Sequence, residues 1–224
     1  MGYEAKILGY VRGLLLDNYP AGREDQQVHL DEQGAQLVSQ SAAPYSEIVR
    51  QGRAFYVNTT TAVASLTALP TTAVTIALYN NEPDGGRSYI IDQVWALYTV
   101  NSATIPHCGI IANLGQTRAA LPANSAMIPK KCNGMGPAYD TKAITIIGGT
   151  ALDAITGLAI NWFPLGQSVN AAVTSLPGFQ QLVNVDGRYI CPPGRYFAVH
   201  TLASAVTSSA QIGIVWHEKT ITLG

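Results

Sequence analysis

The fold class is decided by the stretch Arg87-Ser88-Tyr89-Ile90-Ile91-Asp92-Gln93-Val94-Trp95-Ala96-Leu97-Tyr98-Thr99-Val100. It is rich in β-branched and aromatic residues, which favour strands. Because side chains of a strand alternate between its faces, strict alternation predicts two apolar sets: Tyr89, Ile91, Trp95 and Leu97 against Ile90, Val94, Ala96 and Tyr98. A strand that is apolar on both faces is covered on both sides. We therefore expect it inside a sandwich, with one face toward another subunit.

Other segments also have the pattern of strands and are separated by short turns. Residues 74–79 alternate with period 2, as a strand does. Turns are expected at Pro83-Asp84-Gly85-Gly86 and at Pro192-Pro193-Gly194, where glycine supplies a positive φ. Further strands are predicted at residues 107–113, 142–147, 157–163, 180–185, 195–202 and 209–219. Eight to ten strands, with hardly any helix signal after residue 20, predict an all-β fold, an antiparallel β-sandwich.

The N-terminal segment differs from the rest of the chain. Residues 1–53 hold 12 of the 27 charged groups. The segment is expected to be helical at first and extended afterwards, and it has too little apolar surface to fold alone. We therefore divide the chain into a docking arm, residues 1–50, and a β-sandwich body, residues 51–224. The candidate contact residues of the arm are the helically spaced Ile7, Leu8, Val11, Leu14 and Leu15, together with Tyr45.

The body carries unusually few charges. The whole chain has 27 charged residues in 224, against about 56 expected from average composition, and Ser, Thr, Asn and Gln number 54. A free domain keeps a mixed, charged surface, whereas interface cores are depleted in Lys, Glu and Asp. We therefore expect much of the surface to meet protein, most simply other copies of the chain. The net charge of −1 predicts no nucleic-acid partner.

No motif for catalysis, a cofactor or a metal is present, and no enzymatic activity is predicted. Cys108, Cys132 and Cys191 form no CxxC pair and are expected to be buried free thiols. His200 and His217 are expected on neighbouring strands joined near residues 204–207, which places them roughly 20 Å apart, too far for a shared ion. No run of about 20 apolar residues suggests a membrane span.

Carboxylates and tryptophans are the remaining candidates for binding a ligand. Most body acids adjoin Gly or Pro in predicted loops, where solvated turn formers are the common case. Trp95, Trp162 and Trp216 lie within apolar strands, which favours packing in a core or an interface over stacking on a sugar.

Several segments resemble tailed-phage virion proteins of trimeric jelly-roll type. They are Pro44-Tyr45-Ser46-Glu47, Gln51-Gly52-Arg53-Ala54-Phe55, the run from Gly86 to Val94, the run from Cys191 to Phe197, and the run from Gly213 to Glu218. The resemblance covers most of residues 44–218 and implies a jelly-roll-like sandwich that forms a homotrimer. It further implies a capsid decoration (cement) protein of the virion, assembled in the host cytoplasm, whose arm binds the major capsid protein or other virion proteins.

Two alternatives stay open at this point. Within the same class, the chain would be a jelly-roll capsid, tail or neck component. In a different class, it would be a carbohydrate-binding module for receptor recognition, which needs exposed aromatic rings and loop Asp or Asn groups on one concave patch. An enzyme ranks third.

Overall fold

The structure is a computed structural model of the whole chain, and it describes residues 45–70, 73–74, 76–100, 107–117, 128–137, 140–147, 153–154, 162–170, 179–203 and 208–221. The chain divides into two units, Met1–Ala43 and Pro44–Gly224. The boundary predicted between residues 50 and 51 falls directly after the helix of the second unit. Among the described residues, no helix is long and apolar enough to cross a membrane.

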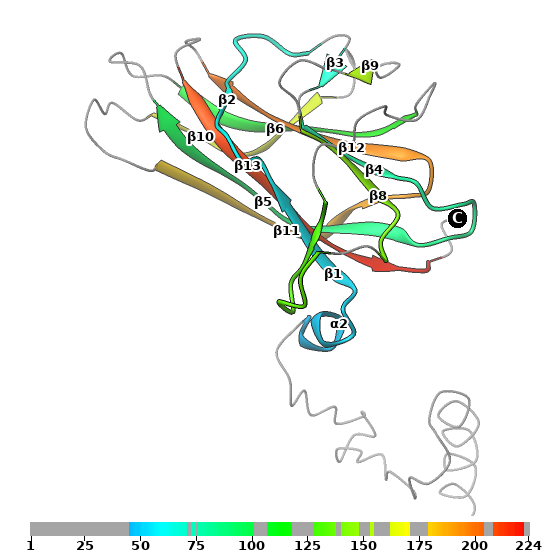
Figure 1. Cartoon of the computed structure of the whole chain (residues 1–224). Helices are drawn as coiled ribbons and strands as arrows, with labels where there is room; N and C mark the ends of the chain where they lie inside the picture. Colours follow the sequence, from blue (N-terminus) through cyan, green and yellow to red (C-terminus); the bar gives the residue numbers. More distant parts are fainter. Residues whose placement is uncertain are drawn as a thin grey trace, which may run out of the picture. The chain divides into compact units, whose positions relative to one another are not determined.

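In the described part of the second unit, the regular elements are strands and one short helix (Figure 1). Its elements, in chain order, are α2 Ser46–Arg50, β1 Ala54–Asn58, β2 Val63–Ala64, β3 Ala73–Val74, β4 Ile76–Asn80, β5 Ser88–Val100, β6 His107–Thr117, β7 Lys130–Lys131, β8 Ala143–Ile147, β9 Asp153–Ala154, β10 Trp162–Asn170, β11 Phe179–Cys191, β12 Arg195–Ala203 and β13 Ser209–Lys219. The strand over residues 209–219 matches its prediction at both ends.

Eight strands of the two sheets pair as a jelly roll. One sheet, here the β5 sheet, has the order β11-β5-β13-β1-β7, and β2 also pairs with β13; the other, the β6 sheet, has the order β10-β6-β12-β4-β8. The two-residue strands β2, β3, β7 and β9, and β8, which extends the β6 sheet beyond β4, lie outside this set. Among the other eight strands, the first pairs with the eighth, the second with the seventh, the third with the sixth and the fourth with the fifth, all antiparallel. This is a double Greek key, and it confirms the predicted sandwich class.

The core lies between the two sheets. Its largest side chains are at most 1% exposed and come from both layers, including Phe55 and Trp216 of the β5 sheet and Leu78 and Phe197 of the β6 sheet. The ring of Trp216 lies 5.8 Å from that of Phe55 and 6.2 Å from that of Tyr89, centroid to centroid. Burial of this extent, at about 25 cal/mol per Å² of apolar surface, is the main stabilising contribution of the fold.

A β-bulge at Asp92 changes the faces of the longest strand. The register joins Val215 to Gln93 and then Trp216 to Ile91, so that Asp92 is passed over. After a bulge the alternation is shifted by one residue. The inward set is therefore Tyr89, Ile91, Val94, Ala96 and Tyr98, all at most 1% exposed. The prediction from strict alternation, which placed Trp95 on the face of Ile91, is wrong.

The two histidines of the C-terminal strands lie in different sheets. His200 pairs with Ile111 in the β6 sheet, and His217 pairs with Ile90 in the β5 sheet. The expectation that β12 and β13 are neighbours is wrong, because a jelly roll carries the chain from one sheet to the other at this connection. Residues 204–207 lie outside the described part of the chain.

Two smaller expectations are also corrected. Cys191 is buried as predicted, but Cys132 is exposed in the turn after β7, and the side chain of Cys108 lies outside what the structure describes. The segment after Pro44, expected to be extended, forms α2. The helix has the acidic Glu47 in its first turn and the basic Arg50 in its last, and their side chains pair three residues apart, which stabilises a short helix.

The outer face of the β6 sheet is covered within the chain. Ala77, Tyr196 and Ala198 form a second buried cluster there, with Tyr79 and Trp162 packed against it. The indole Nε1 of Trp162 donates to the carbonyl of Pro70 at 2.9 Å. His200, on the same face by alternation, is 1% exposed, and burial lowers its pKa to about 4. The imidazole is therefore neutral at pH 7.

Candidate interaction surface

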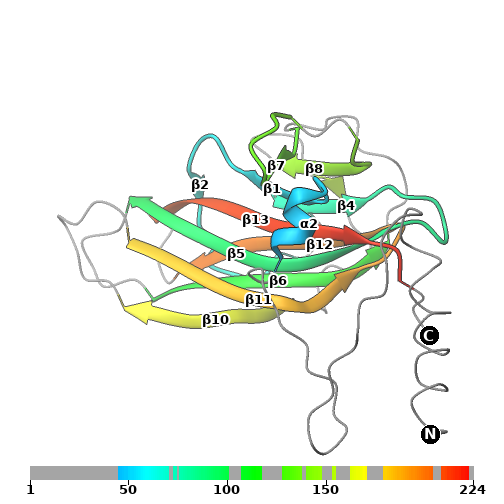
Figure 2. The same cartoon turned by 90° about the horizontal axis from the view of Figure 1, so that it is seen from below.

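Across β1, β13, β5 and β11, the outer face of the β5 sheet carries three rows of residues without a charge. Registered pairs run across β1, β13, β5 and β11, which lie side by side in Figures 1 and 2. We call these rows the neutral face; they are Tyr56–Val215–Gln93–Asn184, Asn58–Gly213–Trp95–Leu182 and Gln211–Leu97–Gln180. None of these residues is Asp, Glu, Lys, Arg or His. Lys130 of β7 adjoins the first row, where it pairs with Tyr56.

The centre of the neutral face is apolar. Trp95 and Leu97 are partly exposed, and Leu182 on the edge strand β11 is 53% exposed. Around this centre lie the amides of Gln180, Asn184, Gln211 and Asn58, and the Gln93 amide nitrogen donates to the Asn184 amide oxygen at 2.8 Å. An apolar centre with a neutral polar rim is the composition of a protein–protein interface.

Glycine at position 213 makes room for the Trp95 indole. A Cβ at Gly213 would lie 2.2 Å from Cε2 and 2.3 Å from Nε1 of Trp95, which is closer than any real contact. The ring therefore lies directly over the Cα of Gly213 and buries it. Since only glycine permits this approach, the packing of the Trp95 ring against the sheet depends on Gly213.

Ionisable side chains are grouped at one end of the outer face. The His217 Nδ1 lies 2.9 and 3.0 Å from the two carboxylate oxygens of Asp92, and the Tyr45 ring packs on the imidazole at 5.8 Å. Burial, and then the charges of Asp92 and Asp186, raise the pKa of Tyr45. Tyr45 has the left-handed φ of 67°, so the chain turns sharply where it enters α2.

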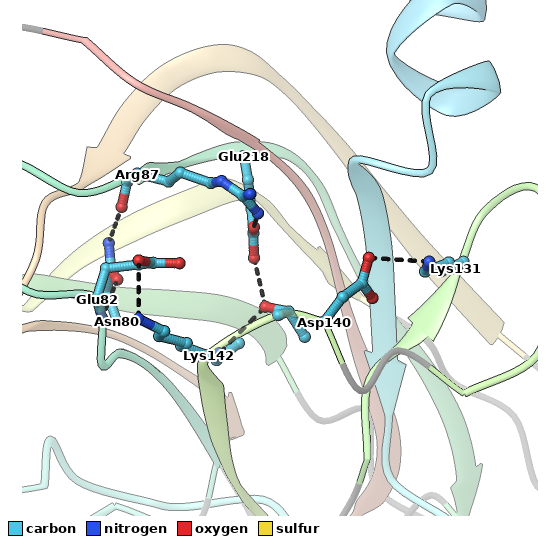
Figure 3. A network of polar contacts seen from close by, with 9 residues as sticks. Asn80, Glu82, Arg87, Lys131, Asp140, Lys142 and Glu218 are labelled. Carbon is cyan, nitrogen blue, oxygen red and sulfur yellow. Dashed lines mark hydrogen bonds and ion pairs between the residues drawn. The ribbon is translucent and has the colours of Figure 1, made fainter.

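A polar cluster closes one end of the sandwich (Figure 3). The Asn80 amide donates to the carbonyls of Arg87 and Cys191, each at 2.9 Å, which ties the β4–β5 connection to the end of β11. Arg87 pairs with Glu218 of β13 at 3.0 Å. The Thr141 hydroxyl donates to the same carboxylate. The cluster thereby joins the two sheets at their ends.

The carboxyl of Glu218 is the most buried ionisable group of this cluster, with a side chain that is 0% exposed. Burial is the largest cause of its raised pKa, and the hydrogen bonds from Thr141 and Arg87 act in the opposite direction. Each of its two oxygens has a partner. A buried carboxylate whose two oxygens each accept a hydrogen bond fixes the strand ends, so we assign it a structural role.

The predicted contact residues fall into two groups. Tyr45 contacts the body at His217, whereas Ile7, Leu8, Val11, Leu14 and Leu15 lie outside the described residues. In the part of the chain that is described, no three His, Cys, Asp or Glu side chains are grouped as metal ligands. The three tryptophans differ in place: Trp216 is in the core, Trp162 is partly buried on the β6 sheet, and Trp95 is on the neutral face.

Gly213→Ala tests the packing of Trp95. The added methyl group forces the indole away from the sheet, so we expect the free energy of unfolding to fall by about 2 kcal/mol, as in overpacked sites. In a Trp95→Ala background the same change should be neutral or slightly stabilising, because alanine replaces a glycine in a strand. Urea unfolding of the double-mutant cycle measures the coupling. As a control, Gly213→Ala should remain destabilising in a Trp162→Ala background, and additive effects with Trp95→Ala contradict the packing described.

Arg87→Met leaves the buried Glu218 carboxylate without its cation, and we expect a loss of about 3 kcal/mol at pH 8. The pKa of Glu218, already raised from 4.5, rises further without Arg87. Between pH 4.5 and the raised pKa, the folded chain holds a proton on Glu218 that the unfolded chain releases. The free energy of unfolding therefore falls as the pH rises from 4.5 to the raised pKa. The loss should be smaller at pH 5 than at pH 8 in urea unfolding. Arg50→Met, which removes an exposed ion pair, is the control and should change little; equal losses at both pH values refute the assignment.

No family model matches the chain, and no curated protein matches it in sequence. Among solved structures, a chain of turnip yellow mosaic virus is similar to it, with 11% identity, a TM-score of 0.20, and coverage of 89% of this chain and 93% of that one. A likeness of that size carries no inference about function. The jelly-roll assignment therefore rests on the strand pairing.

Proposed function

We propose that this chain is a non-enzymatic structural protein of a tailed-phage virion, a homotrimeric capsid decoration protein that reinforces the shell. The observation that carries the proposal is the neutral face, an open sheet surface with an apolar centre and no charged residue. A solvated sheet face ordinarily carries polar and charged side chains. Burying this face against protein removes Trp95, Leu97 and Leu182 from water without leaving an unpaired charge.

The fold is compatible with this function and with others. Jelly rolls occur in viral capsid proteins, lectins and cupins, and a fold does not define a function. Two features favour assembly over catalysis. The buried Glu218 is fully paired by Arg87 and Thr141. The apolar side chains of Trp95, Leu97 and Leu182 lie together on one sheet face.

The arm is the proposed contact with the shell. Residues 1–43 precede the body, and Ile7, Leu8, Val11, Leu14 and Leu15 have the spacing of one apolar helix face. A segment that orders on binding can cover a large partner surface. The proposed partner is the major capsid protein or another virion protein, met after synthesis in the host cytoplasm.

A carbohydrate-binding module is the second candidate, and one observation favours it. Trp95 presents a partly exposed indole on an open face, flanked by the amides of Asn58 and Gln93, and aromatic rings with neighbouring amides suit a sugar ligand. In this case the purified chain would bind glycans as a stable monomer, and Trp95→Ala would abolish the binding.

Deletion of residues 1–40 tests the proposed function. The body has its own core, so the truncated chain should keep its far-UV circular dichroism and its thermal midpoint. It should lose attachment to particles assembled without this protein, measured by co-sedimentation against the full chain. A matched control is the fivefold variant that replaces Ile7, Leu8, Val11, Leu14 and Leu15 with Ser, which keeps the length but should also lose attachment. Full occupancy by the truncated chain would refute the role of the arm.

A further inference from the structure

The neutral face has the properties of a contact between identical chains. Its central row, Asn58–Gly213–Trp95–Leu182, crosses four strands without a charge, and Leu182 is 53% exposed at its end. The rows on either side end in Asn184 and Gln180, both exposed. The patch therefore reaches the edge strand β11 as neutral surface along three successive rows.

Closed symmetry explains why such a patch is neutral. In a trimer, residues far from the three-fold axis meet a different part of the neighbouring chain, whereas residues at the axis meet their own copies. A Lys or Glu there would oppose the same charge on the neighbouring chain, and like charges directly opposite are destabilising. Amides are tolerated, because Asn and Gln carry donors and acceptors together and can pair with themselves. A partner of different sequence imposes no such restriction, since opposite charges can then be placed across the interface.

Ionisable groups of this sheet lie at the borders of the patch: Lys130 of β7 pairs with Tyr56 at the β1 end of the first row, the end farthest from β11. Asp92, His217 and Tyr45 are grouped at one end of the outer face, and they pair with one another. The three neutral rows themselves therefore bring no charge into a contact with a second copy.

We propose that the neutral face is the surface by which copies of this chain meet around a closed rotation axis, with Trp95 and Leu182 at the centre of the contact. The occupant of the face is a second copy of the chain, not the capsid. This inference rests on the proposed homotrimer and specifies the surface that forms it.

The test places a charge in the central row of the face. Leu182→Lys and Leu182→Glu are prepared separately in the full chain, and Leu69→Lys serves as the control, because Leu69 is also a half-exposed leucine, at 46%, but lies outside the β5 sheet. Native mass spectrometry and light scattering measure the oligomer. We expect the unmodified chain and Leu69→Lys to be trimers. Each Leu182 variant should dissociate to monomers, with at least a tenfold higher dissociation constant.

Mixing the two Leu182 variants completes the test. Opposite charges then meet near the axis, so a 1:1 mixture should regain oligomers that contain both variants, which also shows that both are folded. Three results overturn the inference: a monomeric unmodified chain, a Leu182→Lys variant that remains a trimer, or a mixture that stays monomeric. Dissociation by Leu69→Lys to the same degree overturns it as well.

The outcome is separable from that of the proposed function. Binding to particles is measured on the same samples by co-sedimentation. If Leu182→Lys stays a trimer but no longer binds particles, the neutral face meets the shell, and the inference is wrong while the decoration function stands. If the trimer depends on Leu182 but never binds particles, the inference stands and the decoration function fails.

Discussion

A β-sheet has two faces, and a two-layer sandwich covers only one face of each sheet from within. In this chain the inner faces bury Trp216, Phe55 and Phe197 almost completely. The outer faces are treated differently. On the β6 sheet, Tyr196 and Ala198 are buried by other parts of the same chain, and Pro70 accepts a hydrogen bond from Trp162. On the β5 sheet, Leu182 and its neighbours remain exposed without a charge among them. The proposals for assembly follow from this difference.

The sequence alone is sufficient for the class of the fold. The strand over residues 209–219 and the turn at Gly194, with its φ of 74°, were predicted correctly, because alternation and glycine are local signals. Apolar residues on both faces of residues 87–100 also indicated that the outer side of that strand has an apolar surface. The low charge of the body pointed in the same direction, since composition reports on the environment of the surface.

The details of the surface depend on contacts that are distant in sequence. A single extra residue at Asp92 reverses which side chains point inward, and nothing near Asp92 in the sequence announces the bulge. The closeness of Gly213 to Trp95 joins residues more than 100 positions apart. The pairing of Arg87 with Glu218 likewise depends on the jelly-roll order, and the same order separates His200 from His217. These are properties of topology, which a local pattern does not encode.

The central claim is that the neutral face is covered by protein in the working state. An electron cryo-microscopy reconstruction of the purified oligomer, or of particles that carry it, measures this directly. The claim predicts that Trp95 and Leu182 are buried against a neighbouring chain, with no layer of solvent between them. A reconstruction in which the outer faces of β5, β11 and β13 are directed into solvent in every subunit would contradict it.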